Sequence, residues 1–229
     1  MKAMILAAGR GERLRPLTDK LPKPLVPVLG KPMIVYHIEK LAAQGITDIV
    51  INHAWLGHLL PETLGDGRRW GVKLHFSAEA TALETGGGIK QALSLLGDDP
   101  FLVINGDVFI DALPSGIFGA KTLSASSLAN EDLAHLWLVD NPAQHPEGDF
   151  VLADGRLSQH GHVKFTFSGI GLYHPALFNN TPDGAFALGP LLRSAMDNNR
   201  ISGGKFQGLW CDVGTVARLT ALEQRLSGC

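Results

Sequence analysis

Residues 6–27 read LAAGRGERLRPLTDKLPKPLVP and combine glycines, cations and prolines directly after a short apolar run. Residues 2–7, which overlap that run, predict a buried strand. Gly9 and Gly11 let the chain turn tightly after the strand, and they let the backbone approach a ligand that a Cβ atom would exclude. Backbone N–H groups in such a turn bind phosphate. The stretch therefore predicts a strand followed by a loop that receives an anion.

The cations of this stretch favour the same kind of ligand. Arg13 and Lys23 are separated by a segment that Pro16 and Pro22 stiffen, with further prolines at 24 and 27. Proline restricts φ and lowers the entropy of the unfolded loop, so such a loop can hold its cations in one shape. Arginine binds two phosphate oxygens at once, whereas lysine acts as a point charge. For the glycines alone, a surface turn with scattered cations remains an alternative.

Two common phosphate-binding motifs are missing from the sequence. A GxGxxG dinucleotide motif that starts at Gly9 would need glycine at position 14, where Leu14 stands. A GxxxxGK[ST] P-loop occurs nowhere in the chain. A phosphate-binding loop of another type is therefore predicted.

The composition narrows the class of protein. The chain has 229 residues, of which 45% are hydrophobic and 18% charged, and its formal net charge is -2. These values predict a globular α/β domain and argue against a nucleic-acid partner. No window approaches the roughly 18 apolar residues of a membrane helix, so we expect no membrane partner. With Cys211 and the terminal Cys229 as its two cysteines, the protein is expected in the reducing cytoplasm.

Strand-like and helix-like segments alternate along the chain. In the first half, strands are expected at residues 2–7, 47–54, 72–79 and 100–111, and helices at 33–46 and 85–97. In the second half, strands are expected at residues 135–142, 149–154, 164–175 and 205–215, helices at 188–199 and 216–226, and an exposed loop at 120–130. This order predicts an α/β fold with a Rossmann-like mixed, mostly parallel sheet flanked by helices, as one domain over residues 1–229.

The opening stretch resembles the signature of the sugar-1-phosphate nucleotidyltransferases, which usually reads L-A-A-G-x-G-[ST]-R-[LM]-x-P-L-T and is followed by P-K-P. The match runs through residues 6–9, 11, 13–14, 16–18 and 22–24. Glu12 departs from the pattern, and because a carboxylate is unfavourable beside a triphosphate, we expect it to point away. The resemblance implies the nucleotide-diphospho-sugar transferase type of fold, with a nucleotide-binding half at residues 1–110 and a sugar-binding half at 111–229.

Two aspartates are candidates for a metal site. Asp107 follows a buried strand in the sequence NGD, and Asp212 lies in LWCDVGT about a hundred residues later. An aspartate at a strand end can also be a turn former or a helix cap, but two carboxylates could share a hard divalent cation. The family resemblance supports this pairing, because it carries one metal-binding aspartate at each of these positions. It implies Mg²⁺, with Mn²⁺ as a possible substitute.

The resemblance also assigns residues to the nucleotide. The segment LETGGG at residues 83–88 resembles the L-G-T-A-G segment that packs against the base in the family, although a helix-opening turn with Thr85 as N-cap explains it as well. Asn52 could read the base edge, because its amide offers a donor and an acceptor. Arg13 and Lys23 are the predicted catalytic residues. The predicted nucleotide contacts are Ala7, Ala8, Gly9, Gly11, Glu12, Arg13, Lys23, Asn52, Thr85 and Gly86.

The sugar side is less completely matched. The segments VDNP and TFSGIGLYH would lie there, and the E-K-P motif whose lysine grips the sugar phosphate in many relatives is missing. Lys164 is a candidate substitute, with a solvated lysine at a strand end as the alternative. The predicted sugar contacts are Asn105, Asp140, Ser168, Gly169 and Lys164.

Several short motifs indicate a position within the family. VINHAWLG, LETGGGI, LVDNP, GDF and FSGI most resemble the members that join UTP to N-acetyl-α-muramate 1-phosphate in cell-wall recycling. The alternatives are a mannose-1-phosphate guanylyltransferase and, in another class, a non-catalytic sensor of nucleotide-sugars. The expected partners are therefore a nucleoside triphosphate and a sugar 1-phosphate, bound by a monomer or a small homo-oligomer.

Overall fold

The structure is a computed structural model that describes residues 1–115, 117 and 132–228. The exposed loop predicted at residues 120–130 lies outside the described residues. In the part of the chain that the structure describes, no helix is both long and apolar enough to cross a membrane.

The chain divides into two compact units, each built from separate segments. The first unit contains Lys2–Ala82, Ile104–Ala112 and Leu209–Cys229, and the second contains Leu83–Val103 and Leu113–Gly208 together with Met1. The strand β6 (Phe101–Asn105) contributes residues to both. No observation tests the single domain with halves at residues 1–110 and 111–229, which therefore stays a prediction.

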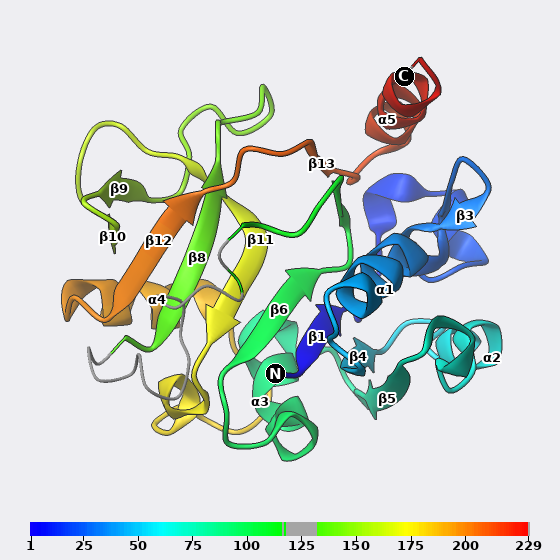
Figure 1. The fold of residues 1–229 in the computed structure, drawn as a ribbon, viewed down its shortest axis with the longest axis horizontal. Coiled ribbons are helices and arrows are strands. Elements are labelled where there is room, and N and C mark those ends of the chain that lie inside the picture. Colours follow the sequence, from blue (N-terminus) through cyan, green and yellow to red (C-terminus); the bar gives the residue numbers. More distant parts are fainter. Residues whose placement is uncertain (116, 118–131, 229) are drawn as a thin grey trace. The chain divides into compact units, whose positions relative to one another are not determined.

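The first unit contains three parallel strands in the order β5-β4-β1 (Figure 1). Its other strands form two small antiparallel pairs, β2 with β3 and β7 with β13. The bounds of these strands are β1 (Ala3–Leu6), β2 (Pro27–Val28), β3 (Lys31–Pro32), β4 (Asp48–His53), β5 (Lys73–Ala78), β7 (Val108–Ile110) and β13 (Trp210–Asp212).

The helices of the first unit cover its apolar strands. In α1 (Met33–Ala43), Ile34, Ile38 and Leu41 are buried, as their helical spacing predicts. The remaining helices are α2 (Leu59–Leu64), α5 (Val216–Ser227) and the short 3-10 helices η1 (Glu12–Leu14), η2 (Leu17–Asp19), η3 (Lys23–Leu25) and η4 (Arg68–Trp70). One core cluster joins Val26, Phe109, Val213 and Leu222, so segments far apart in sequence are fixed together around β7 and β13.

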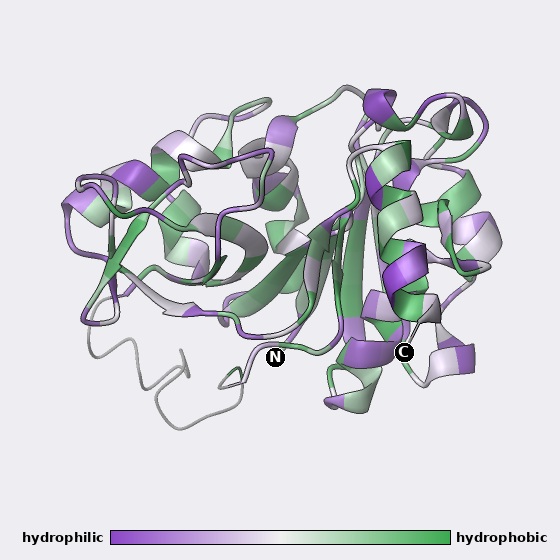
Figure 2. Ribbon diagram, turned by 90° about the horizontal axis from the view of Figure 1, so that it is seen from above, coloured by the Kyte–Doolittle hydropathy of each residue, from purple (hydrophilic) through white to green (hydrophobic). Residues whose placement is uncertain are grey.

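The second unit contains a mixed sheet in the order β11-β8-β12-β10-β9. The strand β8 pairs in parallel with β12 and antiparallel with β11, and β10 pairs antiparallel with β12 and β9. The bounds are α3 (Glu84–Leu96), β8 (Ala134–Val139), β9 (Val151–Ala153), β10 (Arg156–Ser158), β11 (Thr166–Tyr173), η6 (Pro175–Phe178), α4 (Leu188–Asp197) and β12 (Ile201–Lys205). Figure 2 shows mostly hydrophobic strands beside helices that carry hydrophilic residues.

These observations confirm the α/β class with a mixed, mostly parallel sheet flanked by helices, but the strands of two predicted segments differ. The segment 100–111 contains β6, which ends as predicted at the turn-like residues 105–107, and then a further short strand, β7. The strand and turn predicted at 205–215 begin too early, because Lys205 ends β12 and β13 begins only at Trp210. Prediction from the sequence missed β12, because its sequence ISGGK has two glycines and no apolar alternation.

Candidate active site

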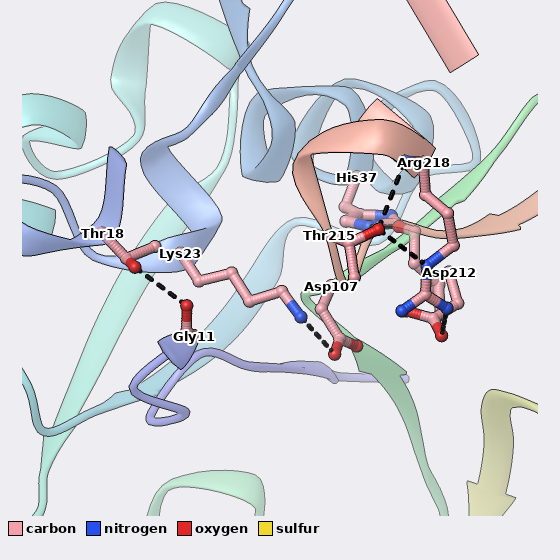
Figure 3. A network of polar contacts seen from close by, with 9 residues as sticks. Gly11, Thr18, Lys23, His37, Asp107, Asp212, Thr215 and Arg218 are labelled. Atoms are coloured by element: carbon pink, nitrogen blue, oxygen red, sulfur yellow. Dashed lines mark hydrogen bonds and ion pairs between the residues drawn. The ribbon is translucent and has the colours of Figure 1, made fainter. Parts of the chain in front are cut away.

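The loop after β1 is held by contacts within the first unit. Gly11 has a φ of 67°, a left-handed conformation that L side chains rarely adopt. The Thr18 hydroxyl donates a hydrogen bond of 2.8 Å to the Gly11 carbonyl (Figure 3). A Cβ atom at position 11 would lie 3.0 Å from the Cβ of Lys23. Glycine is therefore required here by the backbone conformation and by the close approach of Lys23.

Gly9 is different, because nothing in the fold demands glycine there. Its φ lies outside the positive region, and no described atom would lie within 4 Å of an added Cβ. The next residue, Arg10, stacks over the Trp55 ring at 4.4 Å, and its guanidinium lies 3.7 Å from the exposed Glu12 carboxylate. The backbone at Gly9 is therefore open to a ligand, and Glu12 is directed toward Arg10.

Alanine substitutions at Gly11 and Gly9 should affect different properties, the first stability and the second phosphate binding. We expect Gly11→Ala to lower the free energy of unfolding by about 1–2 kcal/mol, because it forces an L residue into the left-handed region. Gly9→Ala should leave the unfolding free energy within about 0.5 kcal/mol of wild type and still weaken phosphate binding. Urea unfolding and nucleotide titration of both variants would test this. A Gly9→Ala protein with unchanged nucleotide affinity would contradict the role given to this loop.

Lys23 and Asp107 form an ion pair across 84 positions of the sequence. The Lys23 side chain is almost entirely buried, and its Nζ lies 2.8 Å from Oδ2 of Asp107 (Figure 3). The turn that carries Asp107 is fixed to β1, because the Gly106 N–H donates a hydrogen bond of 2.8 Å to the Leu6 carbonyl. A side chain at position 106 would clash with that carbonyl, at 2.5 Å from Cβ. The sequence NGD thus places a carboxylate beside the cation of the loop.

Asp212 reaches the same region from the far end of the chain. It ends β13, which pairs with β7, and the Val213 N–H donates a hydrogen bond of 2.9 Å to the Asp107 carbonyl. The Asp212 carboxylate is paired with the Arg218 guanidinium, which also bonds to the hydroxyl of Thr215. The structure therefore places Asp107, directly before β7, beside Asp212 at the end of the paired strand β13.

Arg13 belongs to this cluster as well. A Cβ atom built at Gly214 would lie 2.9 Å from Oδ1 of Asp212 and 3.1 Å from Nη2 of Arg13. Arg218 would come closer still to that Cβ, so Gly214 leaves the space in which the two guanidiniums and the carboxylate meet. Prediction from the sequence missed Arg218. Its position six residues after Asp212, at the start of α5, was the available signal.

His37 lies beneath Asp107 and is fully buried. Its Nε2 makes a hydrogen bond of 2.8 Å with the Val108 carbonyl, so this nitrogen carries the proton. Among the described residues, its Nδ1 is a buried nitrogen without a hydrogen-bond partner. Burial, with a smaller contribution from Lys40, lowers the pKa of His37 to about 4, although Asp107 acts in the opposite direction. His37 is therefore neutral at pH 7 and supports the strand that follows Asp107.

The lowered pKa makes stability depend on pH. The pKa of His37 in the folded state lies below the ordinary value of 6.5. The full contribution of His37 to the free energy of unfolding is therefore present above pH 6.5 and is lost as the pH falls toward 4. We expect a loss of up to about 3 kcal/mol from this residue. His37→Gln should show a smaller decline of unfolding free energy over this range than wild type. The exposed His58→Gln is the control, and equal pH slopes for wild type and His37→Gln would contradict the assignment.

Asn52 is placed differently from its predicted role. It is 2% exposed, its Oδ1 accepts the Ala7 N–H at 2.9 Å, and its Nδ2 donates to Oε1 of Glu79 at 2.7 Å. The amide therefore links the ends of β1, β4 and β5 inside the first unit. These contacts give Asn52 a positioning role on the loop that begins with Ala7 and the half-buried Ala8, in place of an exposed amide for reading a base.

The predicted base-binding segment lies in the second unit. The helix α3 begins at Glu84 and its N-cap is Leu83, so the reading of Thr85 as N-cap is wrong, and Thr85 is exposed. Gly86 is buried, and a Cβ there would lie 2.4 Å from the Phe186 ring. The packing of Phe186 is therefore a structural reason for glycine at this position.

The predicted sugar contacts have several different environments. Ser168 is completely buried, and its hydroxyl donates to the Trp137 carbonyl at 2.7 Å and accepts the Ile170 N–H at 3.1 Å. Gly169, with a φ of 78°, lies at the irregularity of β11 beside it. The Ser168 side chain thus stabilises the strand and presents no exposed atom. Asn105 ends β6 in the first unit, whereas Asp140 and Lys164 lie in the second.

The donor set available for a metal is small. In the ranges that the structure describes, no group of three or more His, Cys, Asp or Glu side chains is arranged to hold an ion. Asp107, directly before β7, and Asp212, at the end of β13, are compatible with a hard cation that takes its other ligands from phosphate oxygens and water. Burial raises the pKa of the Cys211 thiol and Asp212 raises it further, which favours the protonated thiol and a packing role.

Sequence comparison identifies the class of protein to which this fold and this cluster of charged side chains belong. The family model of the nucleotidyl transferases matches residues 2–127, and the chain belongs to this family. The family resemblance inferred from the opening stretch is therefore confirmed.

Individual relatives extend the match over the whole chain. This chain is 54% identical to an N-acetylmuramate alpha-1-phosphate uridylyltransferase of Neisseria meningitidis, over 100% of its own length and 99% of the length of that protein. A protein of the same name from Caulobacter vibrioides is 34% identical over 98% of this chain and 96% of its own length. A mannose-1-phosphate guanyltransferase of Gibberella zeae is also 34% identical, but only 61% of its length is covered.

A solved structure supports the fold. A crystallised candidate glucose-1-phosphate thymidylyltransferase from Bacillus anthracis has a TM-score of 0.81 to this chain, with 24% identity. The match covers 98% of this chain and 94% of that one. At this identity the comparison establishes the fold alone.

Proposed function

We propose that this enzyme joins UTP and N-acetyl-α-muramate 1-phosphate to give UDP-N-acetylmuramate and pyrophosphate. The observation that carries the proposal is the 54% identity along the whole chain to the uridylyltransferase of Neisseria meningitidis. The mannose-1-phosphate guanyltransferase relatives are less similar over the full chain or match a part of it. The product is a precursor of the cell wall, so the reaction belongs to peptidoglycan recycling in the cytoplasm, carried out by a monomer or a small homo-oligomer.

The cluster in the first unit supports this chemistry. The sugar phosphate is already an anion, so its oxygen can attack the α-phosphorus of UTP and displace pyrophosphate without a general base. Two anions must approach each other, and catalysis consists mainly of alignment and charge neutralisation. Lys23 is buried beside Asp107, so its charge lies next to the carboxylate that would hold the metal. Arg13 and the open loop backbone at Gly9 would hold the leaving pyrophosphate.

The same cluster supports a requirement for Mg²⁺. Carboxylates beside a phosphate site would repel the substrates, and their presence is explained if Asp107 and Asp212 hold a divalent cation. The ion would neutralise phosphate charge and hold the reacting groups in line. In the structure Lys23 and Arg218 balance the two carboxylates. These cations would turn toward substrate phosphates when the carboxylates bind metal.

Removal of either carboxylate should abolish most of the metal-dependent turnover. We expect Asp107→Asn and Asp212→Asn to lower kcat on the order of 10²-fold or more, because phosphate charge is then left unneutralised. Pyrophosphate release measured across a titration of Mg²⁺ or Mn²⁺ would test this, with circular dichroism to confirm folding. The exposed Asp66→Asn, which breaks an ion pair with Arg68 in the same unit, is the matched control. Near-normal turnover of either site variant would exclude the two-aspartate assignment.

The choice of substrates is tested on the wild-type enzyme. Pyrophosphate release is measured for every combination of UTP, GTP, dTTP and CTP with the 1-phosphates of N-acetylmuramate, mannose and glucose. We expect kcat/KM for UTP with N-acetylmuramate 1-phosphate to exceed that for GTP with mannose 1-phosphate by on the order of 10²-fold. A faster guanylyl reaction would replace the proposal by its first alternative. Binding of nucleotide-sugar without turnover of any pair would favour the sensor.

A further inference from the structure

A cation with a replaceable partner lies at one edge of the sheet in the second unit. The strand β12 runs parallel to β8, with Lys205 opposite Leu138, so the carboxyl ends of both strands share this edge. Ligands of α/β proteins commonly bind at the carboxyl ends of parallel strands. Lys205 is the last residue of β12, and Asp140 follows directly after β8. The antiparallel β11 begins at the same edge, preceded by Phe165.

Lys205 is held in position on two sides. Its Nζ lies 2.6 Å from Oδ1 of Asp140 and 4.8 Å from the centre of the Phe165 ring. Its side chain is 38% exposed, whereas that of Asp140 is 80% exposed. An aspartate that is almost fully hydrated gains little from a surface ion pair. A carboxylate on a ligand can therefore take its place at Lys205 with little cost, while the aromatic ring keeps the cation in place.

The neighbouring polar side chains have structural roles instead. Asn141 accepts a hydrogen bond from the Thr166 hydroxyl at 2.9 Å, and its amide donates to the Lys164 carbonyl at 2.9 Å. Asp149 accepts the Phe167 N–H at 2.8 Å and lies 3.1 Å from the imidazole of His145. These groups fix the chain around β11. Lys205 is a cation at this edge whose ion-pair partner is a largely exposed carboxylate.

We propose that Lys205 binds the carboxylate of the lactyl group of the sugar substrate and so selects muramate from neutral amino sugars. This inference rests on the proposed function, because it assumes that a sugar 1-phosphate with a lactyl ether is the substrate. Asp140 holds the lysine in the free enzyme and is displaced by the substrate carboxylate. The lysine acts on specificity and takes no part in the transfer of the uridylyl group.

The test uses two substrates that differ in the lactyl group alone. For the full-length enzyme with UTP and Mg²⁺, kcat/KM is measured for N-acetylmuramate 1-phosphate and for N-acetylglucosamine 1-phosphate, and their ratio is the readout. We expect Lys205→Met to lower this ratio on the order of 10-fold or more, by loss of the muramate reaction alone. Lys205→Arg should restore most of the ratio. Asp140→Asn should keep it at or above the wild-type value, because the competing carboxylate is removed.

Three results would overturn the inference. If Lys205→Met lowers both reactions equally, or if Asp140→Asn has the same effect as Lys205→Met, the pair is a structural ion pair. If Lys164→Met lowers the ratio and Lys205→Met does not, the carboxylate is bound by Lys164. Lys73→Met, which removes an exposed lysine at the start of β5, is the control for loss of positive charge. The proposed function is judged separately, by whether the wild-type enzyme uses the muramate substrate.

Discussion

The ion pair between Lys23 and Asp107 is the contact on which the arrangement of the first unit depends. A lysine that is 7% exposed needs an anion, because burial of an unpaired ammonium is costly. The stem of the same lysine packs against Gly11, and Thr18 closes the loop by bonding to the Gly11 carbonyl. One side chain thus joins the loop after β1 to the turn before β7. The glycine at position 11 is a consequence of this packing.

Two cations of the cluster are paired with its carboxylates. Asp107 balances Lys23, Asp212 balances Arg218, and Gly214 leaves room for Arg13 beside them. The neutral His37 supports the strand after Asp107 without adding a further charge. Electrostatic preorganisation of this kind suits a reaction between two anions.

Several residues of the predicted site have structural roles within their own unit. In the first unit, Asn52 and Glu79 form a buried network that fixes the Ala7 N–H, and these groups hold the loop. In the second unit, Ser168 and Gly86 are used for strand and helix packing. Family motifs therefore include residues with structural roles. The exposed pair joins Asp140, which lies in the VDNP segment, to Lys205, which lies outside the quoted family motifs.

The sequence by itself determined the local elements and the family. Helical spacing predicted α1 with Ile34, Ile38 and Leu41 inside, and glycine after an apolar strand predicted the loop at Gly9 and Gly11. These predictions succeed because periodicity and backbone freedom are properties of a few consecutive residues.

Only the tertiary structure decided which charges meet. Lys23 and Asp107 are 84 positions apart, and Arg218 reaches Asp212 because residues 213–215 lead from β13 directly into α5. The same holds for Asn52, whose amide is buried because three parallel strands end beside one another. The separation of two residues along the sequence does not reveal the register of the strands that carry them. That register determines which charged side chains meet.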